Sequence, residues 1–422
     1  MNRSAVPERV DAVVIGSGAL GASTCFHLAK AGLSVAMLDK AELASQTSPR
    51  AAGLSGVLRP DIAMTRIATR GVEKIVNFQA ETGEPMEFQQ PGSLKIARLP
   101  QHEAQVHEDV ERGRALGLDV ALISFDEARR LMPFLSTDGV RAVMHIRSDV
   151  YLEPVQVPAG YARASARLGA ITLPNMPVEE ILTIGAAVAG VRTPHGDIRA
   201  PVVVDAAGAW LRVVAEQGGA SVKLVPTRHQ LMLTARLPDV RPTQPITRII
   251  DANVYVRPDN GSLMLGGYES DPVQYDMRDI PKDFCIENLE LDLAVLRRLA
   301  KSVAEQFPVF RDVAIREFRG GLPTMTADGE HVLGPAPGIG GLYVIGGCCV
   351  GGLTTAPALG EILSDWITQG RPSSDVSFMA PDRLATQLPE EVLRDLCRLR
   401  YAHHYWPPES MPNDAAAETR MT

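Results

Sequence analysis

The stretch VVIGSGALGASTCFHLAKAGLSVAMLD, residues 13–39, decides the fold of this chain. An apolar run at 11–15 precedes a glycine-rich loop, and a segment with helical spacing follows at 19–31. Gly32 ends that segment before a second apolar run at 34–39. Strand, glycine loop, helix and strand within about 30 residues are typical of a βαβ unit. The sequence therefore predicts a buried parallel sheet that starts near the N-terminus.

The glycine loop has the spacing Gly16-x-Gly18-x-x-Gly21. In this pattern the first glycine permits a tight turn, the second lets the backbone approach a diphosphate, and the third lets helix and strand pack closely. Asp39 ends the second strand, where a carboxylate accepts hydrogen bonds from ribose hydroxyls. These features predict a dinucleotide in a Rossmann-like domain. The alternative is a glycine-rich site where a helix packs on a strand.

A second glycine-rich strand–loop–helix pattern, YVIGGCCVGGLTTAPALGE, occupies residues 343–361. A flavin needs a second site of this kind, because its reduced form holds negative charge that a helix N-terminus stabilises. Gly351, Gly352 and Leu353 could present N–H groups there. We therefore expect FAD rather than NAD. The alternative is a core strand followed by a packed helix.

The region between the two glycine loops contains β-rich sequence. Residues 224–269 indicate a series of strands, and the turn PDNG at 258–261 joins two of them. We expect an α/β fold, α+β overall, in which a Rossmann-like FAD-binding domain is interleaved with a mainly antiparallel substrate domain. The expected FAD-binding domain comprises 8–90, 150–222 and 325–385, and the substrate domain comprises 91–149 and 223–324. Residues 386–422 are expected to be a partly disordered C-terminal extension.

Composition excludes some functions. The chain has 422 residues and a formal net charge of −8, which argues against a nucleic-acid-binding face. Its five cysteines have no zinc-ligand spacing, so we expect no metal and a reduced, cytoplasmic protein. We also expect no membrane span, because no apolar stretch of about 18 residues occurs.

Several motifs together resemble the FAD-dependent amine and amino-acid oxidoreductases of the D-amino-acid oxidase superfamily. The resemblance is closest to the flavin part of dimethylglycine and sarcosine dehydrogenases. The motifs, besides the two glycine loops, are SPRAAGLSGVLRP, VVVDAAGAW, HQLMLT, VYVRPDNGSLMLGGYE and TADGEHVLGPAPGIGG. The resemblance implies that hydride leaves a C–H next to nitrogen for flavin N5, and that the imine is then hydrolysed.

The resemblance also implies which residues bind the cofactor. They belong to the first glycine motif, the loop beside the flavin, the adenine end, the AGAW turn and the second glycine loop. In this order they are Gly16, Gly18, Gly21 and Asp39; Ser48, Ala51, Ala52 and Gly53; Val178; Ala207, Gly208 and Trp210; and Gly347, Gly351, Gly352, Leu353 and Thr354.

Arg50 departs from the family pattern. In the dimethylglycine-type enzymes a histidine just before AAGL bonds covalently to the flavin, and here that position is Arg50. A guanidinium is not a usable nucleophile at neutral pH. The segment 319–328, where sarcosine oxidases attach their flavin, contains no cysteine. We therefore expect noncovalent FAD. Arg50 either lies near the flavin or its phosphates, or points to solvent.

Two residues are candidates for chemistry. The resemblance places His229 and Tyr255 near the substrate, where His229 would orient the amine or act as a base. The alternatives are a histidine bonded at a strand edge and a half-buried strand tyrosine. We expect the adjacent histidines of AHHYW, 402–406, to form no metal site, because neighbouring residues on a helix point in different directions. A substrate carboxylate would favour a guanidinium, and the candidates are Arg59, Arg257 and Arg319.

These features favour oxidation of a secondary or tertiary amine, such as sarcosine or dimethylglycine, with O2 or another carrier as electron acceptor. One alternative is a D-amino-acid or glycine dehydrogenase or oxidase. Another is the flavin subunit of a heteromeric sarcosine-oxidase-like complex. A partner subunit or a homo-oligomer therefore stays open. The larger relatives continue into a folate-binding domain of several hundred residues, whereas this sequence has 422 residues, so we expect no built-in one-carbon transfer. If the substrate is N-methylated, we expect release of free formaldehyde or another carbonyl.

Overall fold

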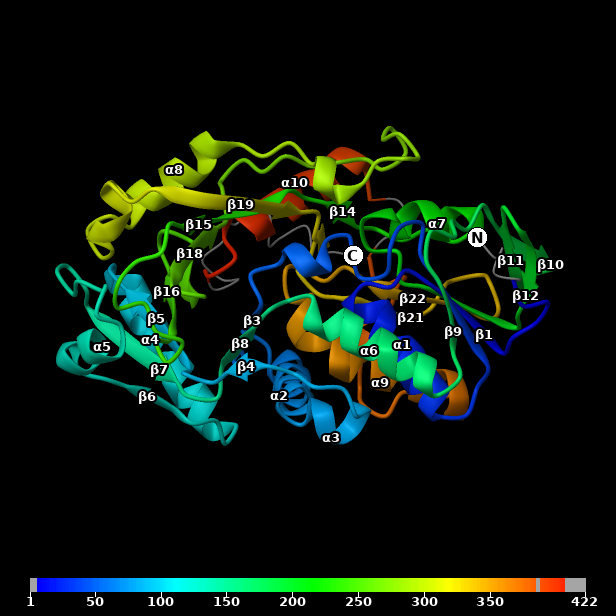
Figure 1. The fold of residues 1–422 in the computed structure, drawn as a ribbon, viewed down its shortest axis with the longest axis horizontal. Coiled ribbons are helices and arrows are strands. Elements are labelled where there is room, and N and C mark those ends of the chain that lie inside the picture. The colour runs from blue at the N-terminus through cyan, green and yellow to red at the C-terminus, as the bar shows by residue number, and fades with distance from the viewer. Residues whose placement is uncertain (1–5, 385–387, 407–422) are drawn as a thin grey trace.

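Figure 1 shows two sheets side by side, each with its own helices, in a computed structural model that describes residues 6–384 and 388–406. The expected βαβ unit is confirmed as β1 (Ala12–Ile15), α1 (Ala19–Lys30) and β2 (Val35–Leu38). Strand β1 pairs in parallel with β2 and with β13 (Val202–Asp205). Within the described residues the first sheet has six strands in the order β21-β22-β13-β1-β2-β9. The three remaining strands are β9 (Ile171–Leu173), β21 (Val332–Pro335) and β22 (Leu342–Gly346).

Alternating residues of β1 pack into two layers. Val14 joins a core with helices on one face, and Val13 joins a second core on the other face. The first layer contains α1, α2 (Ile62–Val76), α3 (Phe78–Thr82), α6 (Gln156–Arg167) and α9 (Gly352–Gln369). The second contains α7 (Leu211–Gln217) and the small sheet β10 (Glu180–Ile184), β11 (Ala187–Thr193) and β12 (Gly196–Arg199). Burial of both faces explains the continuous apolar strands.

In the described part of the chain, the second sheet has eight strands in the order β19-β15-β18-β17-β16-β5-β7-β6. All neighbours are antiparallel except β5 and β16, as the sequence predicts for a mainly antiparallel sheet. Its strands are β5 (Ser93–Ala97), β6 (Val120–Leu122), β7 (Ala142–Ile146), β15 (His229–Thr234), β16 (Ile246–Ile249), β17 (Val254–Asp259), β18 (Ser262–Gly267) and β19 (Ile315–Gly321).

The two faces of this sheet pack against different elements. Val254 and Val256 of β17 pack against α8 (Leu293–Ser302), and α5 (Phe125–Leu131) contributes to the same core. The opposite face, which includes Tyr255, meets α10 (Glu390–Ala402) in a separate core. Helix α4 (Pro100–Ala115) packs along β5, β6 and β7. The sheet therefore presents one set of alternate residues to a space between the two sheets.

Short strands join the two halves. They form the pairs β3 (Leu54–Ser55) with β8 (Val150–Leu152), β8 with β4 (Phe88–Gln89), and β14 (Val225–Pro226) with β20 (Thr324–Met325). The domain boundaries given above stay a prediction, and 407–422 of the expected C-terminal extension lie outside the described residues. None of the described helices is both long and apolar enough to cross a bilayer.

Candidate active site

A cavity of about 620 Å³ lies between the two sheets. Its floor is made by loops that follow strands of the six-stranded sheet, including Gly18 after β1 and Cys348 after β22. Its roof includes His229 and Tyr255 from the eight-stranded sheet. A ligand at the carboxyl ends of parallel strands is the general arrangement of open α/β sheets.

The first glycine loop is built to leave room for a phosphate group. Gly16 has φ +103°, and a Cβ there would lie 2.5 Å from the carbonyl oxygen of Ala206. A Cβ on Gly21 would lie 2.0 Å from the carbonyl oxygen of Gly16. A Cβ on Gly18 would meet only Ser48 Oγ, at 3.3 Å, because this position faces the cavity. The N-terminus of α1 is therefore open to an anion, and the residues fit a dinucleotide diphosphate.

Asp39 fastens the glycine loop to β2. Its Oδ2 accepts hydrogen bonds from the Ser17 backbone N–H, at 2.8 Å, and from Ser17 Oγ, at 2.6 Å. Its Oδ1 accepts one from the Ala41 backbone N–H, at 3.0 Å. Asp39 does not line the cavity. A ribose contact would use the lone pairs that these bonds leave free, and it stays a prediction.

The second glycine loop is strained where it borders the cavity. Cys349 has φ 40° and Val350 has φ 67°, and a β-branched residue rarely adopts positive φ. Strain of this kind persists where the surroundings impose it, and it clusters at functional sites. Gly352 then starts α9, and the backbone from 348 to 355 lines the cavity. A second helix N-terminus therefore opens into the same space, which fits the flavin site expected from the sequence.

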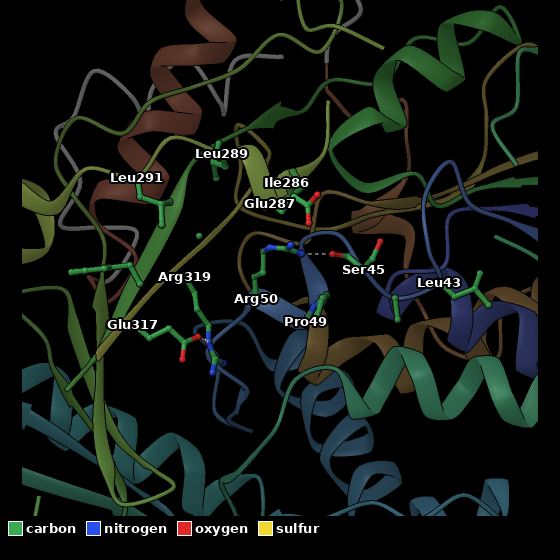
Figure 2. Close-up of a pocket in the computed structure, with 13 residues that line it drawn as sticks. Leu43, Ser45, Pro49, Arg50, Ile286, Glu287, Leu289, Leu291, Glu317 and Arg319 are labelled. Atoms are coloured by element: carbon green, nitrogen blue, oxygen red, sulfur yellow. Dashed lines mark hydrogen bonds and ion pairs between the residues drawn. The ribbon is translucent and has the colours of Figure 1, made fainter. Parts of the chain in front are cut away.

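Arg50 is hydrogen-bonded to the backbone of the loop that contains it. Its Nη1 donates to the carbonyl oxygens of Ser45 and of Gln46, the latter at 2.7 Å. Figure 2 shows this guanidinium between Ser45 and Glu287 in a surface pocket that also contains Arg319. Arg50 lines both this pocket and the large cavity. Its charge therefore holds the backbone of residues 45–50 in a turn beside the cavity.

His229 is held on both sides by tyrosine hydroxyls. Its Nε2 lies 2.9 Å from Tyr255 Oη, and its Nδ1 lies 2.8 Å from Tyr401 Oη. Burial lowers the pKa of His229 to about 4, and burial raises the pKa of Tyr255. All three groups are therefore neutral near pH 7. A neutral imidazole has one donor and one acceptor nitrogen, so one tyrosine donates to the ring and the other accepts.

A cross-strand row positions these side chains. Lys95 pairs with Arg248, Arg248 with Tyr255, and Tyr255 with Gly266 in register. Gly266 leaves the room that the Tyr255 ring occupies, since a Cβ at Gly266 would lie 2.1 Å from Tyr255 Oη. Lys95, Arg248 and Tyr255 line the cavity. Alternation along four adjacent strands therefore brings distant parts of the sequence to one surface.

Two guanidinium groups in the cavity differ in their partners. Arg248 Nη1 lies 3.1 Å from Asp149, which also accepts from Ser93 Oγ and from the Val57 N–H. Arg59 Nε is shielded from solvent and has no hydrogen-bond partner among the described residues. Burial, followed by the nearby charge of Arg248, lowers the pKa of Arg59. Arg59 is thus a cation placed to receive an anionic group of a ligand.

The other two candidate arginines lie outside this cavity. Arg257 forms an ion pair with Asp259 at 3.1 Å, and its Nε donates to the carbonyl oxygen of Ala52 at 2.7 Å. Arg319 lies in the pocket of Figure 2, where it pairs with Glu317. Both guanidinium groups already have carboxylate partners, so the geometry favours Arg59 for a substrate carboxylate.

The cavity gathers most of the expected cofactor residues. Those that line it are Gly18, Ser48, Arg50, Ala51, Ala52, Gly53, Gly208, Gly351, Gly352, Leu353 and Thr354. The remainder do not line it, and they are Gly16, Gly21, Asp39, Val178, Ala207, Trp210 and Gly347. Trp210 packs its ring under Lys40 Nζ, 4.1 Å from the ring centre. Roles in cofactor binding for this second group stay predictions.

Several cavity residues are not among the site residues predicted from the sequence, and they include Arg248, Tyr268, His404 and Tyr405. Arg248 had a signal, because it alternates with buried Ile249 in a predicted strand. His404 stacks on Tyr268 at 4.2 Å between ring centres with an interplanar angle of 21°. The pattern of the AHHYW segment, 402–406, argues against a metal site and does not indicate a place in the cavity wall. Its contact with the cavity depends on a distant chain segment that periodicity does not reveal.

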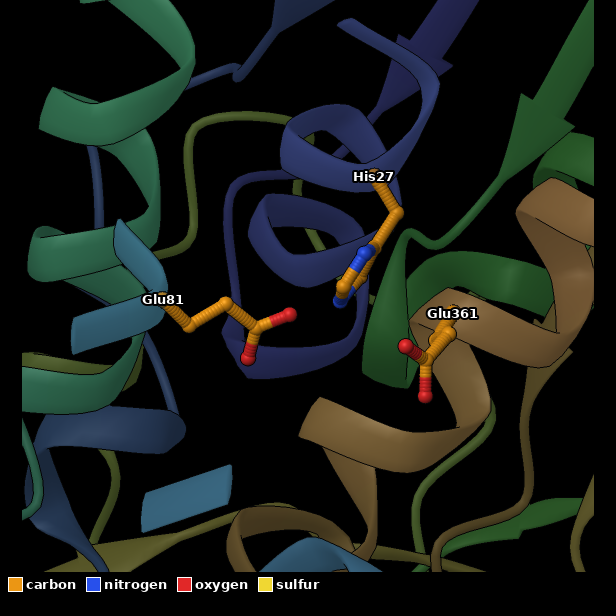
Figure 3. Close-up of side chains that lie close together, drawn as sticks. All are labelled: His27, Glu81 and Glu361. Carbon is orange, nitrogen blue, oxygen red and sulfur yellow. The ribbon is translucent and has the colours of Figure 1, made fainter. Parts of the chain in front are cut away.

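A second cluster lies among the helices, away from the cavity. Figure 3 shows His27, Glu81 and Glu361 pointing toward one another, with ligand atoms all within 4.8 Å. Lys74 Nζ lies 2.7 Å from Glu81 and 3.0 Å from Glu361, and Lys74 is only 3% exposed. The two carboxylates therefore already share a buried ammonium. This network ties α1, α2, α3 and α9 together.

The fold and the two glycine loops define the class of protein to which this chain belongs. Residues 11–366 match the DAO family, described as FAD dependent oxidoreductase, so the chain belongs to this family and FAD is its cofactor. The protein is 28% identical over 385 residues to mitochondrial dimethylglycine dehydrogenase of Rattus norvegicus, covering 89% of this chain and 45% of that protein. It is 31% identical over 379 residues to mitochondrial sarcosine dehydrogenase of Homo sapiens, covering 88% and 41%.

The chain thus spans less than half the length of these curated relatives. Among solved structures, L-proline dehydrogenase from P. horikoshii superposes with a TM-score of 0.82 at 24% identity. That match covers 90% of this chain and 98% of the other. It supports the fold described above.

Proposed function

We propose that this protein oxidises the C–N bond of a secondary or tertiary amine that carries a carboxylate, such as sarcosine or dimethylglycine. The observation that carries the proposal is one cavity that joins the two glycine loops to neutral His229 and Tyr255 and to Arg59, whose Nε has no hydrogen-bond partner among the described residues. Bound FAD supplies a hydride acceptor. The similarity to enzymes named for dimethylglycine and sarcosine supports the substrate class.

Arg59, Tyr255 and His229 would have separate roles in this reaction. Arg59 binds the substrate carboxylate through charge-assisted hydrogen bonds. Tyr255 Oη accepts a hydrogen bond from the substrate N–H, which a tertiary amine carries only when it is protonated, and donates its own hydrogen to His229 Nε2, 2.9 Å away, so that the pair orients the amine. Because burial lowers the pKa of His229 to about 4, the ring is neutral near pH 7 and its Nε2 is free to accept that hydrogen bond.

Anaerobic stopped-flow mixing tests the substrate class. We expect sarcosine or dimethylglycine to bleach the flavin, with D-alanine and glycine as primary-amine controls. Bleaching by primary amino acids alone would contradict the proposal and favour the D-amino-acid or glycine oxidase alternative. Size measurement of the active protein separates a self-sufficient chain from the subunit of a heteromeric complex.

Arg59→Gln tests carboxylate binding. We expect KM to rise about thirtyfold, or about 2 kcal/mol, as for a buried charge pair that loses one partner, with a smaller change in kcat. Arg66→Gln, an exposed arginine on α2, is the matched control. An unchanged KM for Arg59→Gln would show that the carboxylate binds elsewhere.

We also propose that FAD is held noncovalently, because Arg50 occupies the position of the attaching histidine and its Nη1 is bonded to backbone carbonyls. After acid precipitation the yellow colour should appear in the supernatant. Colour that stays in the pellet would overturn this proposal.

A further inference from the structure

The C-terminal segment 390–406 packs against the substrate face of the eight-stranded sheet. Leu393, Cys397 and Tyr401 of α10 are buried in one core with Leu231 of β15 and with Tyr255. The segment then continues past the end of the helix, and residues 403–406 line the cavity. It lies beyond residues 11–366, which match the family.

Two side chains from other elements hold this segment in place. Asn253, in the turn between β16 and β17, donates from Nδ2 to the carbonyl oxygen of Ala402 at 2.9 Å. Asn253 Oδ1 accepts from the Tyr405 backbone N–H at 3.2 Å. Gln105 of α4 donates to the carbonyl oxygen of Tyr405 at 3.0 Å. These side-chain hydrogen bonds to backbone groups hold the segment in place relative to the sheet.

The hydrogen bond between Tyr401 and His229 has a chemical consequence. In the proposed reaction His229 Nε2 must be free of hydrogen so that it can accept the hydrogen bond from Tyr255 Oη, which in turn accepts one from the substrate N–H. The ring hydrogen must then lie on Nδ1, where Tyr401 Oη, 2.8 Å away, is the acceptor. Without Tyr401, a buried Nδ1–H would have no acceptor among the described residues. The ring would then gain by carrying its hydrogen on Nε2 instead, where Tyr255 Oη can accept it.

We propose that Tyr401 is a positioning residue that keeps the hydrogen of neutral His229 on Nδ1, and that segment 390–406 is part of the substrate site. Tyr401 acts through His229 and does not touch the substrate. His404, stacked on Tyr268, belongs to the same wall of the cavity. This inference rests on the proposed function, which requires Nε2 to be free of hydrogen, and the position of the ring hydrogen is measurable without substrate.

Nitrogen-15 NMR of the histidine-labelled, FAD-loaded protein reads the ring hydrogen directly. A His229→Gln sample identifies the His229 signals. We expect wild-type His229 to carry its hydrogen on Nδ1, and Tyr401→Phe to shift the population toward Nε2–H. Tyr275→Phe, outside the cavity, is the matched control and should leave these signals unchanged.

Kinetics then test the effect on the reaction. With the amine that best bleaches the wild-type flavin, we expect Tyr401→Phe to lower the rate of flavin reduction at saturation by about tenfold or more with little change in KM. Asn253→Gly releases Ala402 and Tyr405 but keeps the Tyr401 hydroxyl, and glycine tolerates the φ of 50° at this position. It should shift the His229 signals in the same direction and to a smaller extent.

The outcomes separate the two proposals. Wild-type His229 with its hydrogen on Nε2, or identical His229 signals in wild type and Tyr401→Phe, would overturn the role of Tyr401. So would shifted signals without a slower reduction. Failure of every amine to bleach the wild-type flavin would overturn the proposed function, while the NMR result would still decide the role of Tyr401. If Tyr401→Phe does not fold, Asn253→Gly supplies the same measurement.

Discussion

Gly266→Ala should displace Tyr255 in the active site, although Gly266 itself does not line the cavity. The added Cβ would lie 2.1 Å from Tyr255 Oη and 2.3 Å from Tyr255 Cζ, whereas carbon atoms in contact are normally separated by about 3.5 Å or more. The Tyr255 ring must therefore move by more than an ångström. A shift of this size breaks the 2.9 Å hydrogen bond to His229 Nε2.

The expected loss of stability has two parts. Overpacking a core position costs about 1–3 kcal/mol, and leaving a buried hydrogen-bonding nitrogen without its partner costs about 1–3 kcal/mol. We therefore expect the free energy of unfolding to fall by about 2–6 kcal/mol in urea titrations. FAD should still bind to the native protein, because Gly266 does not line the cavity.

Flavin reduction in the same variant should slow by about a hundredfold or more, as expected when the hydrogen-bonded pair that orients the amine is displaced. Gly340→Ala is the matched control, since its Cβ would have no neighbour closer than 3.5 Å. If Gly266→Ala kept wild-type stability and wild-type reduction, the reasoning about the Tyr255–His229 pair would be refuted.

Three further predictions concern stability and cofactor binding. Lys74→Met should reduce the free energy of unfolding by about 3–5 kcal/mol in urea titrations, because it leaves two carboxylates without their shared cation. Recovery of stability on adding Glu81→Gln would support this cause. A wild-type free energy of unfolding for Lys74→Met alone would contradict it. Because burial lowers the pKa of His229 from 6.5 to about 4, the unfolded chain takes up the proton first, so this residue costs stability as pH falls from 6.5 toward 4. His229→Gln should therefore lower the slope of stability against pH in that window by up to about 1.4 kcal/mol per pH unit, and equal slopes would exclude a buried neutral His229. Gly18→Ala should weaken FAD binding at least tenfold, or by about 1.4 kcal/mol, in a fluorescence titration while the melting temperature of the apoprotein holds, and unchanged affinity would place the diphosphate elsewhere.

The sequence predicts the elements that local pattern determines. The glycine spacing from Gly16 to Gly21 and the flanking apolar runs were enough to predict β1, α1 and β2. The PDNG turn was correctly predicted to join two strands, because Asn260 and Gly261 both adopt positive φ between β17 and β18. These features depend on neighbours in the chain, so their signals are present in the sequence itself.

Contacts between distant segments are not visible in such patterns. Tyr401 meets His229 across 172 residues, and no local periodicity marks either member of the pair. Arg257 shows the opposite case, because the sequence contains a local signal for its ion pair. Side chains two apart on a strand share a face, so Asp259 was already placed to pair with Arg257. The charges at alternate strand positions therefore favour Arg59 over Arg257 as the residue that binds a substrate carboxylate.

The cross-strand row of Lys95, Arg248, Tyr255 and Gly266 restricts how this protein can diversify in evolution. Inserting or deleting one residue within any of these strands would turn its remaining side chains to the opposite face of the sheet. Active-site groups would then enter the layer packed on α8, and valines would enter the cavity. Changes of chain length are therefore confined to the loops and the C-terminal segment. Descendants with new substrate preferences should differ in those regions, or by point substitutions along strands of constant length.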